Sequence, residues 1–95
     1  MSAHLIVYLK KIRDPEMLAE YTRLAVPTIA GTSATICIAR GKNEALEGDP
    51  VEAVVMLKFE TMDEARAWYH SPAYQNALPL RLNSTESTAV LAEGL

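Results

Sequence analysis

The feature that most constrains the fold is a set of strand-like segments whose two faces are both apolar. In the segment Leu5–Leu9, the side chains of residues 5, 7 and 9 point one way and Ile6 and Tyr8 point the other way. The segments 52–59 and 87–93 also carry apolar residues on both faces. A strand with one face in water normally alternates apolar and polar residues. These segments therefore predict a sheet that is covered on both faces.

The chain is too short to cover such a sheet twice. With 95 residues, it can bury about two-thirds of its unfolded surface, which suffices for one modest core and a single domain over residues 1–95. We therefore expect a second copy of the chain to cover the other face, in a homodimer packed sheet to sheet. The alternative is a monomer with an exposed apolar patch, which soluble proteins rarely carry at that size.

The order of the predicted elements indicates the fold class. Strands are expected at about 5–9, 33–40, 52–59 and 87–93, with helical segments between the first and second strands and between the third and fourth. This βαββαβ order is typical of an α+β, ferredoxin-like domain, with a four-stranded antiparallel sheet and helices on one face.

Helix starts are marked by capping residues. Asp14-Pro15 is a cap followed by a proline at the first helical position. Thr61 and Glu64 match a capping box, in which Thr61 accepts from the Glu64 amide and the Glu64 side chain reaches back. Ser71-Pro72 is a second cap that breaks this helix and starts a short one.

Prolines and a cysteine complete the local predictions. Pro27 is expected to kink the first helix, and Pro79 is expected to interrupt the last one. Cys37 is the only cysteine, so no internal disulfide can form, and its β-branched neighbours predict a buried, unreactive thiol.

Charge and hydropathy exclude several classes of partner. Nine Lys and Arg against twelve Asp and Glu leave a net charge of −3, which argues against a nucleic-acid-binding face. The longest apolar runs are five residues, whereas a membrane-spanning helix needs about 20 and a secretory signal about 7–15. We therefore expect a cytoplasmic protein with no membrane partner.

Motifs in the second half of the chain resemble a known family. The run Phe59–Tyr69, with the segments Ser71–Gln75 and Leu78–Arg81 after it, is similar to the small bacterial proteins of domain-of-unknown-function family thirteen-thirty, in the dimeric α+β barrel superfamily. The resemblance implies a ferredoxin-like monomer and a dimer whose sheets close into a barrel. It implies no reaction, although relatives in the superfamily include monooxygenases, lactone isomerases and stress-responsive proteins.

Sequence motifs for metals and cofactors are missing. The chain has no His-Glu-x-x-His, no cysteine pair and no carboxylate cluster at metal spacing. It also has no glycine-rich phosphate loop. We therefore predict no metal site and no bound cofactor.

Three charged residues at the ends of elements are the first site candidates. Arg40 ends the second strand and can bind a carboxylate with its guanidinium fork. Glu47 follows in a loop and can act as a general acid or base. The alternative is an Arg40–Glu47 ion pair that only pins the loop. Arg81 is a second substrate anchor, or it pairs with Glu86 or with the dimer partner.

Aromatic residues and a histidine on the second helical segment complete the candidate site. Tyr69 and Tyr74 follow the apolar stripe, where they either pack in the core or hydrogen-bond a substrate. His70 ends the helix, where a cation suits the helix dipole, and it is the better proton carrier of the two histidines.

Two functions remain open from the sequence. The first is an enzyme or binding protein that holds a small carboxylated or aromatic molecule in a pocket between sheet and helices. In it, Arg40, Arg81, Tyr69 and Tyr74 bind the molecule, and Glu47 or His70 moves protons. The second is a non-catalytic accessory dimer in which these polar groups only hold loops in place.

Overall fold

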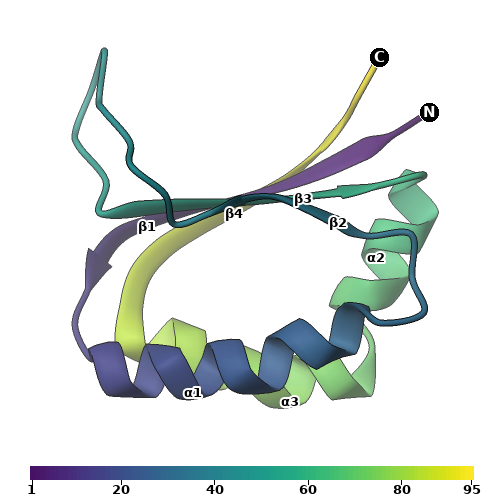
Figure 1. Ribbon diagram of the computed structural model, residues 1–95, viewed down its shortest axis with the longest axis horizontal. Helices are drawn as coiled ribbons and strands as arrows, with labels where there is room; N and C mark the ends of the chain where they lie inside the picture. The colour runs from purple at the N-terminus through teal and green to yellow at the C-terminus, as the bar shows by residue number, and fades with distance from the viewer.

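Four strands and three helices build the structure, a computed structural model that describes residues 1–95 (Figure 1). In chain order they are β1 (Ala3–Ile12), α1 (Pro15–Ala25) with a following 3₁₀ turn (Val26–Ile29), β2 (Thr35–Ala39), β3 (Ala53–Phe59), α2 (Met62–Tyr69), α3 (Pro72–Ser84) and β4 (Thr85–Glu93). The strands form one antiparallel sheet in the order β2-β3-β1-β4. The predicted ferredoxin-like fold is confirmed, with the second helical segment divided into α2 and α3.

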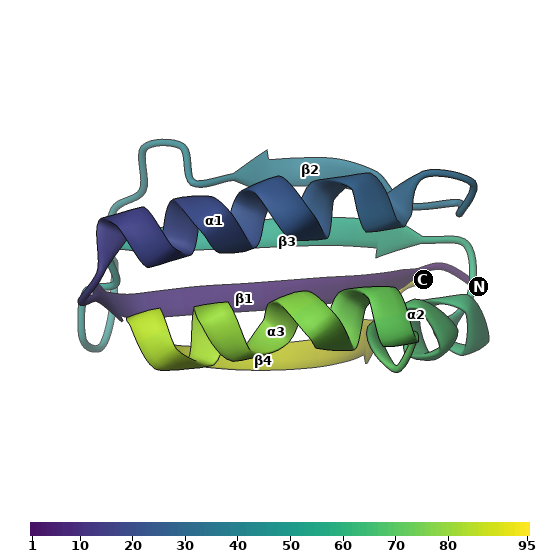
Figure 2. The same cartoon turned by 90° about the horizontal axis from the view of Figure 1, so that it is seen from below.

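The helices cover only one face of the sheet. Helices α1 and α3 run side by side beneath the strands, with α1 along β3 and α3 along β4 (Figure 2). Helix α2 stands at one end of this layer, and the loop between β2 and β3 rises on the opposite side of the sheet (Figure 1). The sheet thus has a helix-covered face and a face that no helix covers.

Strand register places apolar side chains on both faces, as predicted. On the central strand β1, Leu5 and Val7 are buried beneath the sheet with the helices. Cross-strand partners share a face. We call the other face of the sheet the open face. Its apolar side chains are those of Ile6 and Tyr8 and of the residues that share a face with them on the neighbouring strands. They are Ile6, Tyr8, Ile38, Val54, Met56 and Val90.

An aromatic cluster joins the helices to the sheet. The Trp68 ring lies 5.6 Å from the Phe59 ring of β3 and 4.1 Å from the Tyr74 ring of α3, measured between centroids. The Trp68 Nε1 donates a hydrogen bond to Thr28 Oγ1 at 3.0 Å. Because Trp68 is on α2 and Thr28 is in the 3₁₀ turn, this one side chain connects four elements.

The predicted capping residues start all three helices. The Asp14 carboxylate accepts from the Met17 amide at 3.0 Å, Thr61 Oγ1 from the Glu64 amide at 3.1 Å, and Ser71 Oγ from the Tyr74 amide at 3.3 Å. The prediction that the Glu64 side chain reaches back to Thr61 is wrong, however. The Glu64 carboxylate instead accepts a hydrogen bond from the Ser33 hydroxyl, which ties α2 to the segment before β2.

Two proline predictions need correction. Pro79 does not interrupt the last helix, because α3 continues through it to Ser84. The ring removes one helical hydrogen bond, but buried residues on both sides of Pro79, Leu78 before it and Arg81 after it, keep the helix packed on the core. At Pro27 the chain does not kink within α1 but changes from an α-helix to the 3₁₀ turn.

The expected burial of Cys37 is also wrong. Strand β2 is the edge of the sheet, and all five of its residues are exposed. The register shifts between Ile36 and Ile38, so Cys37 occupies the bulge and has no partner opposite it. An apolar sequence context does not bury a residue that falls on an edge strand.

The corner between α2 and α3 yields a stability prediction. Ser71 Oγ accepts from the Tyr74 amide and donates to the Trp68 carbonyl at 2.7 Å. We expect Ser71→Ala to lower the free energy of unfolding by about 1 kcal/mol, because it removes the cap of α3. Ser71→Asp keeps an acceptor at the cap and should lose less. Urea unfolding followed by circular dichroism measures both, and equal losses in the two variants would contradict the capping role.

Candidate functional site

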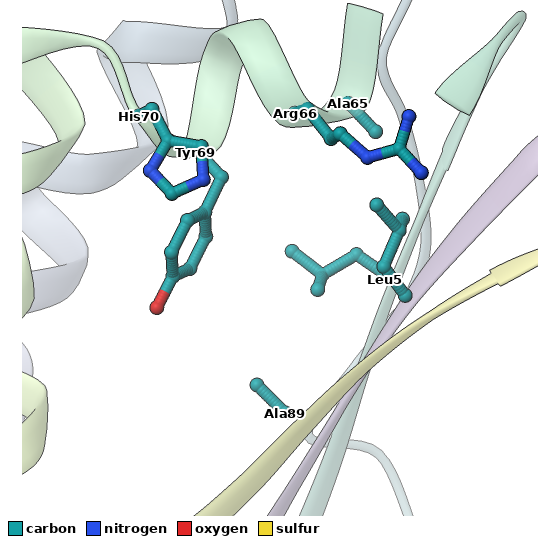
Figure 3. A pocket seen from close by; sticks show the side chains of 7 residues that line it. Leu5, Ala65, Arg66, Tyr69, His70 and Ala89 are labelled. Carbon is teal, nitrogen blue, oxygen red and sulfur yellow. The ribbon is translucent and has the colours of Figure 1, made fainter. Parts of the chain in front are cut away.

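A cavity of about 290 Å³ lies between α2 and the strands β1 and β4 (Figure 3). We call it the α2 cavity. Its lining residues are Leu5, Ala65, Arg66, Tyr69, His70, Ala89 and Leu91.

The local structure explains which side chains reach this cavity. Leu5 and Leu91 are direct cross-strand partners, so both point to the helix-covered face and form the apolar floor. Ala65 and Tyr69 are four residues apart on α2, which places them on one side of that helix. The small side chain of Ala89 leaves space on β4 below the Tyr69 ring.

The polar groups of the cavity come from α2. The Tyr69 ring extends from the helix toward the strands, and the Arg66 guanidinium lies across the cavity from it (Figure 3). The His70 ring meets the Tyr69 ring edge to face, with centroids 5.2 Å apart and an interplanar angle of 87°. The cavity therefore offers a phenol hydroxyl, an imidazole and a guanidinium above an apolar floor.

The electrostatic balance of the α2 cavity favours an anion. No Asp or Glu lines it, whereas Arg66 does. The Arg66 guanidinium contacts the Asp63 carboxylate at 3.3 Å, but that carboxylate is almost fully exposed. An exposed pair of this kind contributes little, so Arg66 can exchange Asp63 for the carboxylate of a ligand.

Arg81 is a buried cation with unsatisfied hydrogen-bonding capacity. Its residue is 3% exposed, its Nη1 donates to Ser87 Oγ at 2.7 Å, and its Nε is buried with no partner. The predicted pairing with Glu86 is wrong, because Glu86 pairs with Arg13. Since β4 alternates, Ser87 faces the helices whereas Glu86 points to the other side of the sheet.

Two tyrosines lie beside Arg81. The guanidinium carbon is 5.9 Å from the centroid of the Tyr21 ring, and the Tyr21 hydroxyl is 2.8 Å from the Tyr74 hydroxyl. Burial raises the pKa of Tyr21 above its usual range, and the contact with Tyr74 adds to this shift. Both phenols therefore share a hydrogen bond in the interior, where the neutral form of Tyr21 is favoured.

The structure brings together four of the six residues predicted for the site. Tyr69 and Tyr74 lie with ring centroids 5.4 Å apart, so His70, Tyr69, Tyr74 and Arg81 form a row along α2 and α3. Sequence reasoning missed Arg66 and Tyr21. The spacing of Arg66 before Tyr69 gave no signal that its turn of α2 faces a cavity, and Tyr21 is identified only by its contact with Tyr74 on another helix.

Arg40 and Glu47 lie apart from this row. Arg40 directly follows β2 and lines a different cavity, between α1 and the strands β2 and β3. Glu47 belongs to the β2–β3 loop and lines a shallow hollow with Tyr8 and Thr88, on the open face of the sheet. The ion pair between Arg40 and Glu47 does not form, since the ion pairs of the structure involve Arg13, Arg23 and Arg66.

Two further observations concern metals and membranes. No group of three or more His, Cys, Asp and Glu side chains comes together in an arrangement that could hold a metal ion. None of the helices combines the length and the apolar character needed to cross a bilayer.

Comparison with protein families identifies one match. A family model described as "Domain of unknown function (DUF1330)" matches residues 2–95. No curated protein matches the sequence.

Solved structures share the fold at low sequence identity. A protein of unknown function from Rhodopseudomonas palustris has a TM-score of 0.74 and 16% identity, with 99% of this chain and 82% of that chain covered. A dimeric ferredoxin-like protein of unknown function from Thermobifida fusca has a TM-score of 0.69 and 17% identity, covering 97% and 90%. SnoaB, a cofactor-independent oxygenase from Streptomyces nogalater, has a TM-score of 0.68 and 10% identity, covering 99% and 93%. Identities this low establish the shared fold alone.

The buried Tyr21 hydroxyl yields a prediction on pH dependence. The pKa of Tyr21 is raised in the folded protein, and in the unfolded chain it is about 10. Above about pH 10, unfolding therefore allows the Tyr21 hydroxyl to lose its proton. The stabilising contribution is therefore complete below about pH 10 and is lost as the pH rises. We expect wild-type stability to fall more steeply than that of Tyr21→Phe above this pH, as measured by urea unfolding at a series of pH values.

An absorbance titration of the phenolates provides the direct check. The wild type should show one tyrosine that ionises only above the usual range, and Tyr21→Phe should lack this late step. A late step that persists in Tyr21→Phe would contradict the assignment.

Proposed function

The chain belongs to the family described as Domain of unknown function (DUF1330), and we propose that it is a homodimer that binds a small carboxylated or aromatic molecule in the α2 cavity. The observation that carries the proposal is the lining of this cavity. Arg66, Tyr69 and His70 stand above an apolar floor, and no Asp or Glu side chain lines the cavity. Concave apolar sites with a few convergent polar groups are the usual form of small-molecule sites.

The lining suggests how such a molecule binds. Its apolar or aromatic body lies on Leu5 and Leu91, and its carboxylate accepts hydrogen bonds from the Arg66 guanidinium. The Tyr69 hydroxyl donates to a second polar group of the ligand. Tyr74 contacts the Tyr69 ring from behind, so we assign it the role of holding that ring in place.

Arg81 and Arg40 have secondary roles in this proposal. Arg81 does not line the α2 cavity. Its buried guanidinium supports the site indirectly, because it contacts the Tyr21 ring and the Tyr21 hydroxyl is hydrogen-bonded to Tyr74. Arg40 lines a different cavity and not the α2 cavity, so it is not an anchor for the same ligand.

If the bound molecule is transformed, His70 is the group that moves protons. It is exposed at the rim of the α2 cavity, and an imidazole can act as a proton donor or as a proton acceptor. Glu47 lies on the other face of the sheet, so it does not share this role within one chain. The likeness to an oxygenase such as SnoaB extends only to the fold, and fold alone does not assign a reaction.

The homodimer rests on the open face. Its apolar side chains include Tyr8 and Val90, which are 37% and 44% exposed in the single chain. Contiguous apolar surface of this kind is typical of an interface, and the related structure from Thermobifida fusca is described as dimeric. The single cysteine, which allows no internal disulfide, is consistent with a cytoplasmic location.

An accessory dimer without a ligand is the alternative function. The large apolar area of the open face favours this alternative, because that surface is enough for the chain to associate with a second copy. It differs from the first proposal in requiring no occupant in the α2 cavity.

The ligand proposal is tested by calorimetry with benzoate and its uncharged analogue benzamide. We expect the wild type to bind benzoate more tightly than benzamide, and Arg66→Gln to lose this preference. The expected loss is about fivefold in benzoate affinity, which corresponds to about 1 kcal/mol for a half-exposed cation.

Arg23→Gln is the matched control for this experiment. Arg23 also forms an exposed ion pair three residues along its helix, with Glu20, but it lines none of the cavities described here. It should leave benzoate binding unchanged. Equal benzoate affinity in Arg66→Gln and the wild type would reject the site, and no binding of either probe would favour the accessory dimer.

The dimer is tested by light scattering during size-exclusion chromatography. The wild type should elute at twice the chain mass, and Val90→Lys should elute as a monomer, because it places a charge in an apolar interface. Leu82→Lys is the control, since Leu82 is an exposed apolar residue on α3, outside the open face. A wild-type monomer, or dimer loss in Leu82→Lys alone, would overturn this assignment.

A further inference from the structure

A second cavity, of about 500 Å³, lies between α1 and the strands β2 and β3. We call it the α1 cavity. Helix α1 runs along β3, with β2 at the outer edge of the sheet beside it (Figure 2). No residue lines both this cavity and the α2 cavity, so the two are distinct.

The walls of the α1 cavity are mainly branched aliphatic side chains. Val26 and Ile29 line it from the 3₁₀ turn, and Ile36, Val55 and Leu57 line it from the sheet. Ile36 and Leu57 are cross-strand partners, so they present a continuous apolar surface. This lining suits the hydrocarbon part of a ligand and offers it no hydrogen bond.

The polar groups of the α1 cavity are already used, except one. The Tyr21 hydroxyl is bonded to the Tyr74 hydroxyl at 2.8 Å, and Thr22 Oγ1 donates to the Leu18 carbonyl at 3.1 Å. Arg40 is the third polar residue of the lining, and its guanidinium forms none of the ion pairs of the structure. No Asp or Glu lines this cavity, so its single free polar group is a cation.

The backbone at Arg40 is held in an unusual conformation. Its φ is +63°, in the left-handed region that glycine adopts without penalty and an arginine does not. The Arg40 amide donates to the Val54 carbonyl at 2.9 Å, which anchors the residue at the end of β2. The fold thus keeps an arginine at the one position beside this cavity where glycine would fit the backbone better.

We propose that the α1 cavity binds an aliphatic monocarboxylate, the chemistry of a medium-chain fatty acid. The carboxylate is held at the rim by Arg40, and the hydrocarbon chain lies between α1 and the sheet. An aliphatic body is favoured because the walls are branched aliphatic groups and no interior polar group is free. The cavity volume is within the range of about 300–1,000 Å³ that is usual for small-molecule sites. This site is separate from the α2 cavity and does not depend on its function.

The affinity of such a site should follow chain length. Each buried CH₂ group tightens binding about fourfold, so octanoate should bind more tightly than hexanoate by about one order of magnitude. Octan-1-ol has the same hydrocarbon chain without the charge and should bind more weakly than octanoate. Calorimetry with the full chain and these three probes measures both effects.

Arg40→Gly tests the role of the cation without endangering the fold, because glycine tolerates the left-handed backbone. We expect octanoate binding to weaken at least about fivefold, the usual contribution of a partly exposed charge contact, and octan-1-ol binding to stay unchanged.

Lys42→Gln is the control. It removes a neighbouring exposed cation that lines none of the cavities described here, and it should leave octanoate binding unchanged. Ala39→Leu adds bulk to the cavity wall and should weaken both probes.

The location of the bound chain is read from nuclear Overhauser contacts between octanoate and protein methyl groups. Contacts to the methyls of Ile29 and Ile36 are expected. Contacts to Leu91 in the α2 cavity, or to Val90 on the open face, would overturn the proposal. So would octanoate binding that is equal in Arg40→Gly and the wild type, or the absence of octanoate binding by the wild type.

Discussion

The packing of Tyr74 is the interaction on which the rest of the structure depends. Its side chain is 1% exposed and contacts the rings of Trp68, Tyr69 and Tyr21. These residues lie on α2 and α1, so a single side chain of α3 fixes the positions of all three helices. The same ring that seals the core also orients Tyr69 toward the α2 cavity, which couples the stability of the fold to the geometry of the candidate site.

The sheet imposes the second constraint. Its four strands are apolar on both faces, but the chain has only enough helix to cover one. The helix-covered face contains the core and both cavities, and the chain leaves the open face uncovered. In the functions proposed above, ligand binding and association use opposite sides of the same strands. The strand β1 contributes to both, through Leu5 in the α2 cavity and Tyr8 on the open face.

Much of the local structure could be predicted because it depends on residues close together in the sequence. The caps at Asp14, Thr61 and Ser71 act within three residues, and the faces of β1 follow from simple alternation. The failures at Pro79 and Cys37 have a common cause. Pro79 is tolerated because the surrounding turn of α3 is packed on the core, and Cys37 is exposed because β2 lies at an edge. Neither packing nor strand order can be read from a local pattern.

The sequence by itself determined the element types, their order, the two-faced sheet and the residues that cap the three helices. Only the tertiary structure decided which of the charged residues share a site. In the folded chain Glu47 lies on the open face, and Arg40 lines a cavity separate from the α2 cavity. Arg81 is buried beside Tyr21, and Arg66 lines the α2 cavity. The physical reason is that periodicity and capping act over a few residues. The surroundings of a side chain, in contrast, depend on how distant elements pack together.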